Sequence, residues 1–186
     1  MPNSTEMFLG SIHLILGPMF SGKTTELIRR MKRFNISNLR CVIIKHSSDN
    51  RYTDNEYIVY THDNINISAV STDMLMPLIQ KIKNVDVIGI DEGQFFCDIS
   101  EFCELMANNG KIIVVAALNG DFKRELFGNI FKLLPIAESI SMLTAVCMKC
   151  YKDASFSKRV TDDTRVKLIG GKETYMAVCR TCFFQN

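Results

Sequence analysis

The chain has 186 residues, 47% of them hydrophobic, which is enough for one medium-sized domain with a small appendage. The formal net charge of +2 gives no strong argument for a nucleic-acid or membrane partner, and no apolar run approaches the ~20 residues of a membrane span. Seven cysteines, an odd number, and a polar start without a basic signal region are more typical of a reducing compartment. We therefore expect a cytoplasmic protein whose cysteines are buried thiols or metal ligands.

The first motif is a glycine-containing loop with the pattern of a phosphate site. It consists of Gly17, Pro18, Met19, Phe20, Ser21, Gly22, Lys23 and Thr24. An apolar run of strand length precedes it at 12–16, and helical spacing follows it at 26–34, which is the context in which this pattern binds a nucleoside triphosphate. The loop amides and the helix dipole would hold the phosphates. Lys23 would reach the β- and γ-phosphates, and the Thr24 hydroxyl would bind Mg²⁺.

The next part of the chain predicts a second parallel strand and a polar loop. The β-branched run at 41–45 is typical of a buried strand. In the loop that follows, Asp49, Asn50 and Arg51 lie where such sheets line a ligand crevice. These residues would either contact nucleotide or a neighbouring strand, or form a solvated turn, and the pattern favours neither. The apolar spacing at 72–83 then predicts a helix.

A second acidic motif follows the predicted strand at 85–90. Asp91 and Glu92 directly follow this apolar run. In triphosphate-dependent enzymes an acidic residue at a strand end holds Mg²⁺, and Asp91 takes that place. Neighbouring side chains point in different directions, so we expect Glu92 to act as a base or to orient the attacking group.

The middle of the chain predicts a helix and the most apolar strand. The helix at 98–109 would be capped by Asp98 and ended by Gly110, with Cys103 on its buried face. The strand at 111–118 is expected to be central. Phe122 and Phe127 follow in the next turn. They could stack on a base or belong to the core, and the residues by themselves slightly favour the core.

From residue 147 onward the chain carries two pairs of cysteines. The pairs are Cys147 with Cys150 and Cys179 with Cys182, separated by 28 residues. This spacing predicts a tetrahedral Zn²⁺ site, and four thiolates leave no open position, so the metal would be structural. Eight Lys and Arg against four Asp and Glu make residues 147–186 only mildly basic. We expect 1–146 and 147–186 to form two domains that pack together.

These motifs together resemble the type II thymidine kinases, the family of the cytosolic cellular and the poxvirus enzymes. The resemblance covers about 11–184 and rests on Gly-Pro-Met-Phe-Ser-Gly-Lys-Thr (17–24), Ile-Gly-Ile-Asp-Glu-Gly-Gln-Phe-Phe (88–96), Val-Val-Ala-Ala-Leu (114–118), Leu-Thr-Ala-Val-Cys-Met-Lys-Cys (143–150) and Cys-Arg-Thr-Cys (179–182). The short ends are more like the poxvirus members. The resemblance implies an α/β fold of the P-loop NTPase kind, a parallel sheet flanked by helices, with a small zinc-binding lasso domain at the C-terminus.

The resemblance also implies an activity, namely transfer of the γ-phosphate of ATP to the 5′-hydroxyl of thymidine. Glu92 matches the general base of the family. The implied ATP site comprises the loop at 17–24 together with Asp49, Asn50, Arg51, Asp91 and Gln94. The implied nucleoside site comprises Met19, Phe95, Phe122, Phe127, Val166, Lys167, Leu168, Ile169, Gly170 and Tyr175. For Phe122 this implication replaces the slight preference for the core.

Further expectations follow from the same resemblance. The loop at 166–170 would close over the nucleoside, and the zinc would fix the two ends of this lasso. The family is typically homotetrameric and is inhibited by thymidine triphosphate, and we expect neither a nucleic-acid nor a membrane partner. The chain departs from the family at Asn119, where Asp is usual, and at Ser157, where several members carry Thr near the base. The alternative is a nucleic-acid-dependent P-loop ATPase with a zinc-ribbon tail.

Overall fold

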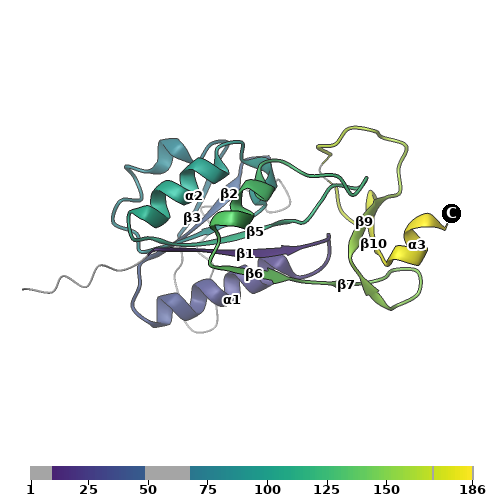
Figure 1. The fold of residues 1–186 in the computed structure, drawn as a ribbon, viewed down its shortest axis with the longest axis horizontal. Coiled ribbons are helices and arrows are strands. Elements are labelled where there is room, and N and C mark those ends of the chain that lie inside the picture. The colour runs from purple at the N-terminus through teal and green to yellow at the C-terminus, as the bar shows by residue number, and fades with distance from the viewer. Residues whose placement is uncertain (1–9, 49–67, 169, 186) are drawn as a thin grey trace, which may run out of the picture.

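The computed structural model describes residues 10–48, 68–168 and 170–185, and its main body is a parallel β-sheet between helices (Figure 1). All neighbouring strands of this six-stranded sheet run parallel, in the order β3-β2-β4-β5-β1-β6. The strands are β1 (Ser11–Gly17), β2 (Cys41–His46), β3 (Ser68–Thr72), β4 (Val87–Ile90), β5 (Ile112–Leu118) and β6 (Ser139–Met142). The α/β fold predicted from the sequence is therefore confirmed, and β5 is an interior strand as expected.

Helices cover both faces of the sheet because its central strands are apolar on both sides. Helix α1 (Lys23–Ile36) lies on one face, and α2 (Ile99–Asn108) with the 3₁₀ segment η3 (Ile130–Ile136) lies on the other (Figure 1). Alternate side chains of a strand point to opposite faces. In β1, Leu14 belongs to the core beneath α2 and Ile15 to the core beneath α1. Both side chains are fully buried.

The prediction of an α-helix at 72–83 is wrong, although the apolar spacing correctly marks residues that are buried. Leu75, Leu78 and Ile82 are buried in the core as the spacing predicts. The segment contains only the short 3₁₀ helix η1 (Met76–Leu78) followed by turns. Its backbone bonds run mostly between residues three apart, such as Lys81 to Leu78. A segment this short is marginal as an α-helix, so packing of its apolar side chains decided its form.

Asp98 occupies the N-cap position of α2, but its side chain does not cap that helix. Its carboxylate instead accepts hydrogen bonds from the backbone N–H groups of Leu75 (2.8 Å) and Met76 (2.9 Å). The predicted capping role is therefore corrected: Asp98 joins the η1 segment to α2. Gly110 does follow the helix with a left-handed φ of 79°, as expected of a residue that ends one. Cys103 is a core residue, and burial raises the pKa of its thiol.

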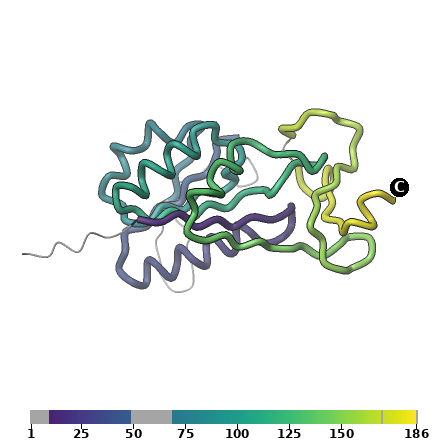
Figure 2. Tube along the Cα trace, viewed as in Figure 1, coloured from purple at the N-terminus to yellow at the C-terminus, as the bar shows by residue number. Residues whose placement is uncertain are grey.

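The C-terminal part forms a small module beyond the carboxyl ends of the sheet strands (Figure 2). It contains two antiparallel hairpins and a short helix: β7 (Ala145–Val146) with β8 (Asp153–Ala154), β9 (Phe156–Arg159) with β10 (Tyr175–Val178), and α3 (Arg180–Phe184). Cys147 and Cys182 are buried in its own small apolar cluster. The module packs on the sheet region, since the Ser157 hydroxyl accepts a hydrogen bond from the Met19 N–H at 2.9 Å.

Within the described ranges, no helix combines the length and the apolar character that crossing a bilayer requires.

Candidate active site

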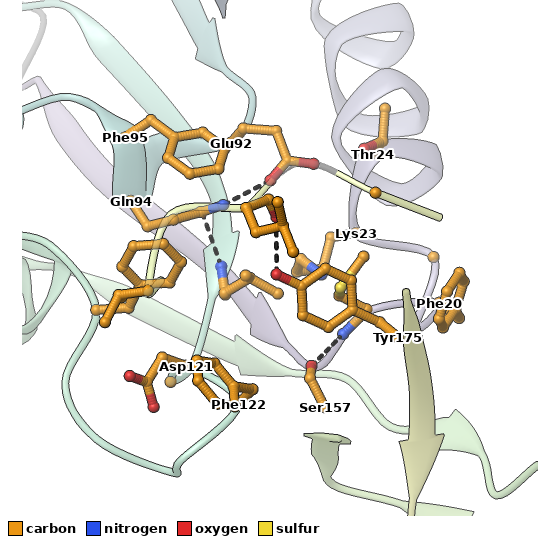
Figure 3. A pocket seen from close by; sticks show the side chains of 18 of the residues that line it. Phe20, Lys23, Thr24, Glu92, Gln94, Phe95, Asp121, Phe122, Ser157 and Tyr175 are labelled. Carbon is orange, nitrogen blue, oxygen red and sulfur yellow. Dashed lines mark hydrogen bonds between the residues drawn. The ribbon is translucent and has the colours of Figure 1, made fainter. Parts of the chain in front are cut away.

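A cavity of about 220 Å³ lies between the carboxyl ends of the central strands and the C-terminal module (Figure 3). In a parallel sheet these strand ends meet at one edge, which is where ligands bind in open α/β folds. The walls come from four segments that are far apart in sequence: the loop after β1, the end of β4, the turn after β5 and the C-terminal module. The lining residues that had been predicted are Met19, Phe20, Gly22, Lys23, Thr24, Glu92, Gln94, Phe95, Phe122, Phe127, Val166, Leu168, Gly170 and Tyr175.

The glycine-containing loop connects β1 directly to α1, as predicted. Gly22 is the N-cap of α1 and has a φ of 81°, a left-handed conformation that favours glycine. The Lys23 ammonium donates to the carbonyl oxygen of Pro18 at 2.8 Å, and the Ser21 hydroxyl donates to the same oxygen at 2.8 Å. Gly17 must lack a side chain, because a Cβ there would lie 2.7 Å from the carbonyl oxygen of Leu143. The loop therefore keeps a compact form around the start of α1.

Asp91 and Thr24 lie together where a divalent cation is expected. The Thr24 hydroxyl donates to one Asp91 carboxylate oxygen at 3.1 Å. The other oxygen, Oδ2, is buried and has no hydrogen-bond partner among the described residues. Burial raises the pKa of Asp91 to about 6, and the adjacent charge of Glu92 adds to this shift. A buried, partly unsatisfied carboxylate beside a hydroxyl fits Mg²⁺, which prefers oxygen ligands.

Glu92 projects toward the cavity and is held by Gln94 (Figure 3). The Gln94 side-chain N–H donates to a Glu92 carboxylate oxygen at 2.6 Å, and its carbonyl oxygen accepts from the Leu118 N–H at 3.0 Å. Glu92 adopts a φ of 53°, which is uncommon for a residue with a side chain. Gly128 allows the Gln94 backbone to approach, because a Cβ at this position would lie 2.2 Å from its carbonyl oxygen. Gln94 thus ties the carboxylate at the end of β4 to the end of β5.

Three predicted aromatic residues lie in the cavity wall rather than in the core. Phe95 and Phe127 meet edge to face with ring centroids 5.7 Å apart. The ring centroids of Phe95 and His46 are 5.6 Å apart. Phe122 lies across the cavity from Phe95 (Figure 3). Aromatic walls of this kind suit a flat, partly apolar ring.

Described residues of the loop that follows β9 line one side of the cavity. Val166, Leu168 and Gly170 line it, and the Tyr175 hydroxyl donates to the Leu168 carbonyl oxygen at 2.7 Å. Position 170 leaves no room for a side chain, because a Cβ there would lie 2.3 Å from the Thr174 hydroxyl oxygen.

Lys167 does not line the cavity, but its ammonium lies 4.9 Å from the centre of the Phe95 ring. The remaining predicted residues, Asp49, Asn50, Arg51 and Ile169, lie outside the described residues.

Sequence reasoning missed Arg159 and the structural role of Asp121. The guanidinium of Arg159 is buried, and its carbon Cζ lies 3.8 Å from the centre of the Phe122 ring. Asp121 is buried and accepts hydrogen bonds from the N–H groups of Lys123 (2.8 Å) and Glu125 (2.9 Å), which shapes the turn that carries Phe122. Arg159 gives no sequence signal, because its backbone and aromatic partners are brought to it by the fold, whereas Asp121 binds backbone N–H groups two and four residues ahead, as Asp commonly does in turns.

The four predicted cysteines converge on one point of the C-terminal module. Their sulfur atoms all lie within 4.8 Å of one another, and those of Cys150 and Cys179 are 3.6 Å apart. Four sulfurs bound to Zn²⁺ at ~2.3 Å in a tetrahedron would be about 3.8 Å apart, so the cluster fits this metal. Burial raises the pKa of Cys147, but backbone N–H groups, first that of Cys179, outweigh burial and lower it to about 6. At Cys147 this favours the thiolate form that binds metal, whereas burial raises the pKa of Cys182 to about 12.

The fold and the site together define an α/β protein with a phosphate-type loop, an acidic pair on a neighbouring strand end and a separate cluster of four cysteines that could hold a metal. The chain belongs to the thymidine kinase family, whose sequence model matches residues 10–183. It is 61% identical to the thymidine kinase of fowlpox virus over 183 residues, which is 97% of this chain and all of the relative. The sheeppox virus and vaccinia virus (strain Western Reserve) thymidine kinases are 56% and 53% identical and match 96% and 95% of the chain, covering 99% and 98% of those proteins. The resemblance stated from the motifs is confirmed.

Proposed function

We propose that this protein transfers the γ-phosphate of ATP to the 5′-hydroxyl of thymidine, giving thymidine monophosphate and ADP. The observation that carries the proposal is the position of Glu92. It lies between the glycine-containing loop on one side and the aromatic cavity on the other (Figure 3). A carboxylate at this boundary can accept the proton of the nucleoside hydroxyl while that hydroxyl attacks the γ-phosphate of the nucleotide.

On the nucleotide side, the loop at 17–24 supplies backbone N–H groups at the start of α1, where the helix dipole favours phosphate. Lys23 balances charge on the β- and γ-phosphates. Thr24 and Asp91 would hold Mg²⁺, which, when bound, neutralises the charge that develops on the transferred group. Gln94 and the segment Asp49 to Arg51 complete the proposed nucleotide contacts.

On the acceptor side, Phe95, Phe122 and Phe127 enclose the thymine ring, and Met19 with the loop at 166–170 closes over the nucleoside. Glu92 takes the proton of the 5′-hydroxyl while the hydroxyl oxygen forms a bond to the γ-phosphorus. The bond between that phosphorus and the bridging oxygen to the β-phosphate breaks, and ADP leaves. Gln94 keeps the Glu92 carboxylate aimed at the acceptor through the 2.6 Å hydrogen bond described above.

The zinc has a structural role in this proposal. Bound to the four cysteines, it joins the segment before β8 to the segment after β10 and thereby fixes both ends of the loop that Tyr175 anchors. We assign residues 1–146 to the nucleotide domain and 147–186 to this closing domain. The proposal further includes a cytoplasmic homotetramer that thymidine triphosphate inhibits and that has no nucleic-acid or membrane partner.

A coupled assay of the purified protein with Mg-ATP tests the proposal. We expect ADP release to depend on thymidine and to yield one thymidine monophosphate per ADP. ATP hydrolysis that responds to nucleic acid and not to thymidine would favour the alternative ATPase and overturn the proposal.

A further inference from the structure

Arg159 stands out because it is a buried cation that the proposed chemistry does not use. Only 8% of the residue is exposed, and it does not line the cavity. It ends strand β9, where it pairs across the hairpin with Tyr175 of β10. Isolating a guanidinium from water is costly unless its hydrogen bonds are met. The partners of its Nη1 and Nη2 groups show what the residue does, while its buried Nε–H has no hydrogen-bond partner among the described residues.

The guanidinium binds three backbone carbonyl oxygens of the closing loop. Nη1 donates to the oxygens of Asp163 (2.8 Å) and Arg165, and Nη2 donates more weakly to that of Val166 (3.4 Å). Nη2 also donates to the Tyr175 hydroxyl, which in turn donates to the Leu168 oxygen. One side chain therefore sets the path of the loop before and through its cavity-lining part.

The same guanidinium contacts an aromatic wall of the cavity. Its Cζ atom lies 3.8 Å from the centre of the Phe122 ring and 5.0 Å from that of Tyr175, within the range of favourable cation–π contacts. Phe122 comes from the turn after β5, so this contact joins two parts of the cavity wall that no strand pairing within the described ranges connects.

We propose that Arg159 is a positioning residue for the acceptor nucleoside, which couples the closing loop to the ring of Phe122 so that both are set together. This inference rests on the function proposed above, because it assigns the loop and the ring to thymidine. Its physical basis is the planar fork of five N–H donors in arginine, which can bind several carbonyls and stack on a ring at once. Lysine keeps the charge but cannot do both.

The test uses Arg159→Lys in the full-length, zinc-loaded protein. We expect the KM for thymidine to rise by about 30-fold, from the loss of charge-assisted hydrogen bonds, while the KM for ATP stays within about twofold. Limited proteolysis with thermolysin gives a second measurement, because cleavage before Val166 and Leu168 should become several-fold faster in the variant. Saturating thymidine should restore part of the protection.

The matched control is Arg165→Ala. The Arg165 side chain is 71% exposed and pairs with Asp163 in the same loop, while its backbone oxygen remains available to Arg159. It should keep the wild-type KM for thymidine. If Arg159→Lys does not fold, Tyr175→Phe carries the test, since it removes only the bridging hydroxyl, and it should raise the KM for thymidine by about fivefold and speed the same cleavage.

Two results would overturn the proposal: wild-type KM and cleavage in Arg159→Lys, or equal losses toward ATP and thymidine. The failure of the proposed function is a separate outcome. A wild-type protein that does not phosphorylate thymidine would refute that function, while the relative cleavage rates of the loop would still decide whether Arg159 orders it.

Discussion

The two sides of the cavity are held together in different ways. The proposed nucleotide side is built on parallel strands, with β1 paired to both β5 and β6 and apolar cores packed on each face. The proposed acceptor side combines aromatic residues that follow β4 and β5 with the C-terminal module, which has two hairpins of two to four residues per strand, a small apolar cluster and four cysteines. A module this small buries too little apolar surface to be stable without a staple. We infer that the sheet preforms the nucleotide side and that metal and side-chain contacts assemble the acceptor side.

The largest effect is expected at Glu92, which lies where the two sides meet. Glu92→Gln keeps the size of the side chain but removes the proton acceptor, so kcat should fall by about 100- to 10,000-fold with little change in either KM. Steady-state kinetics in both substrates check this, with Glu101→Gln on the exposed face of α2 as the control. A near-normal kcat in Glu92→Gln would exclude it as the base.

A change within the sheet region should lower stability without altering substrate selection. Asp98→Ala removes the carboxylate that accepts hydrogen bonds from the backbone N–H groups of Leu75 and Met76, and it leaves the buried N–H of Leu75 without an acceptor. We expect a loss of about 2 kcal/mol in the free energy of unfolding and a melting temperature lower by roughly 4–8 °C. Asp98→Asn, which retains one acceptor oxygen, should lose less. A changed KM for thymidine at an unchanged melting temperature would contradict the division between the two sides.

The smallest effect is expected at Arg124, which joins the turn after β5 to the C-terminal helix. Its guanidinium lies 4.5 Å from the ring centre of Phe183 and 4.7 Å from that of Phe184. Losing these exposed contacts in Arg124→Ala should raise the KM for thymidine by about threefold and leave the KM for ATP unchanged. Arg33→Ala, an exposed change on α1, serves as the control. A change in the KM for ATP alone would contradict the assignment of Arg124 to the acceptor side.

The positions of the residues on the proposed nucleotide side could be predicted from the sequence because their signals are local. The glycine-containing loop lies between an apolar run and a helical pattern, and Asp91 with Glu92 directly follows a buried strand. Parallel strands bring such ends to one edge, so the loop and the acidic pair could be expected to meet. The cysteine pairs were equally clear, since two pairs with a two-residue gap are the typical ligand pattern of a structural zinc site.

The features that escaped prediction have partners that sequence does not reveal. Arg159 binds backbone carbonyls and an aromatic ring from another segment, so it is indistinguishable in sequence from a surface charge. Asp98 is placed to cap its own helix but binds N–H groups of the η1 segment instead. The spacing at 72–83 predicted the buried residues correctly and the helix type wrongly. In a short segment the same apolar side chains can be buried with either α-helical or 3₁₀ backbone hydrogen bonds.

Removal of the metal tests the central claim most directly. The affinities for ADP and for thymidine would be measured by calorimetric titration of the zinc-loaded protein, of chelator-treated protein and of treated protein reloaded with Zn²⁺. We predict that chelation weakens thymidine binding by at least about tenfold, leaves the Kd for ADP within about threefold, and is reversed by reloading. Equal loss of both affinities, or full retention of thymidine binding without metal, would contradict the claim that the zinc module assembles the acceptor side.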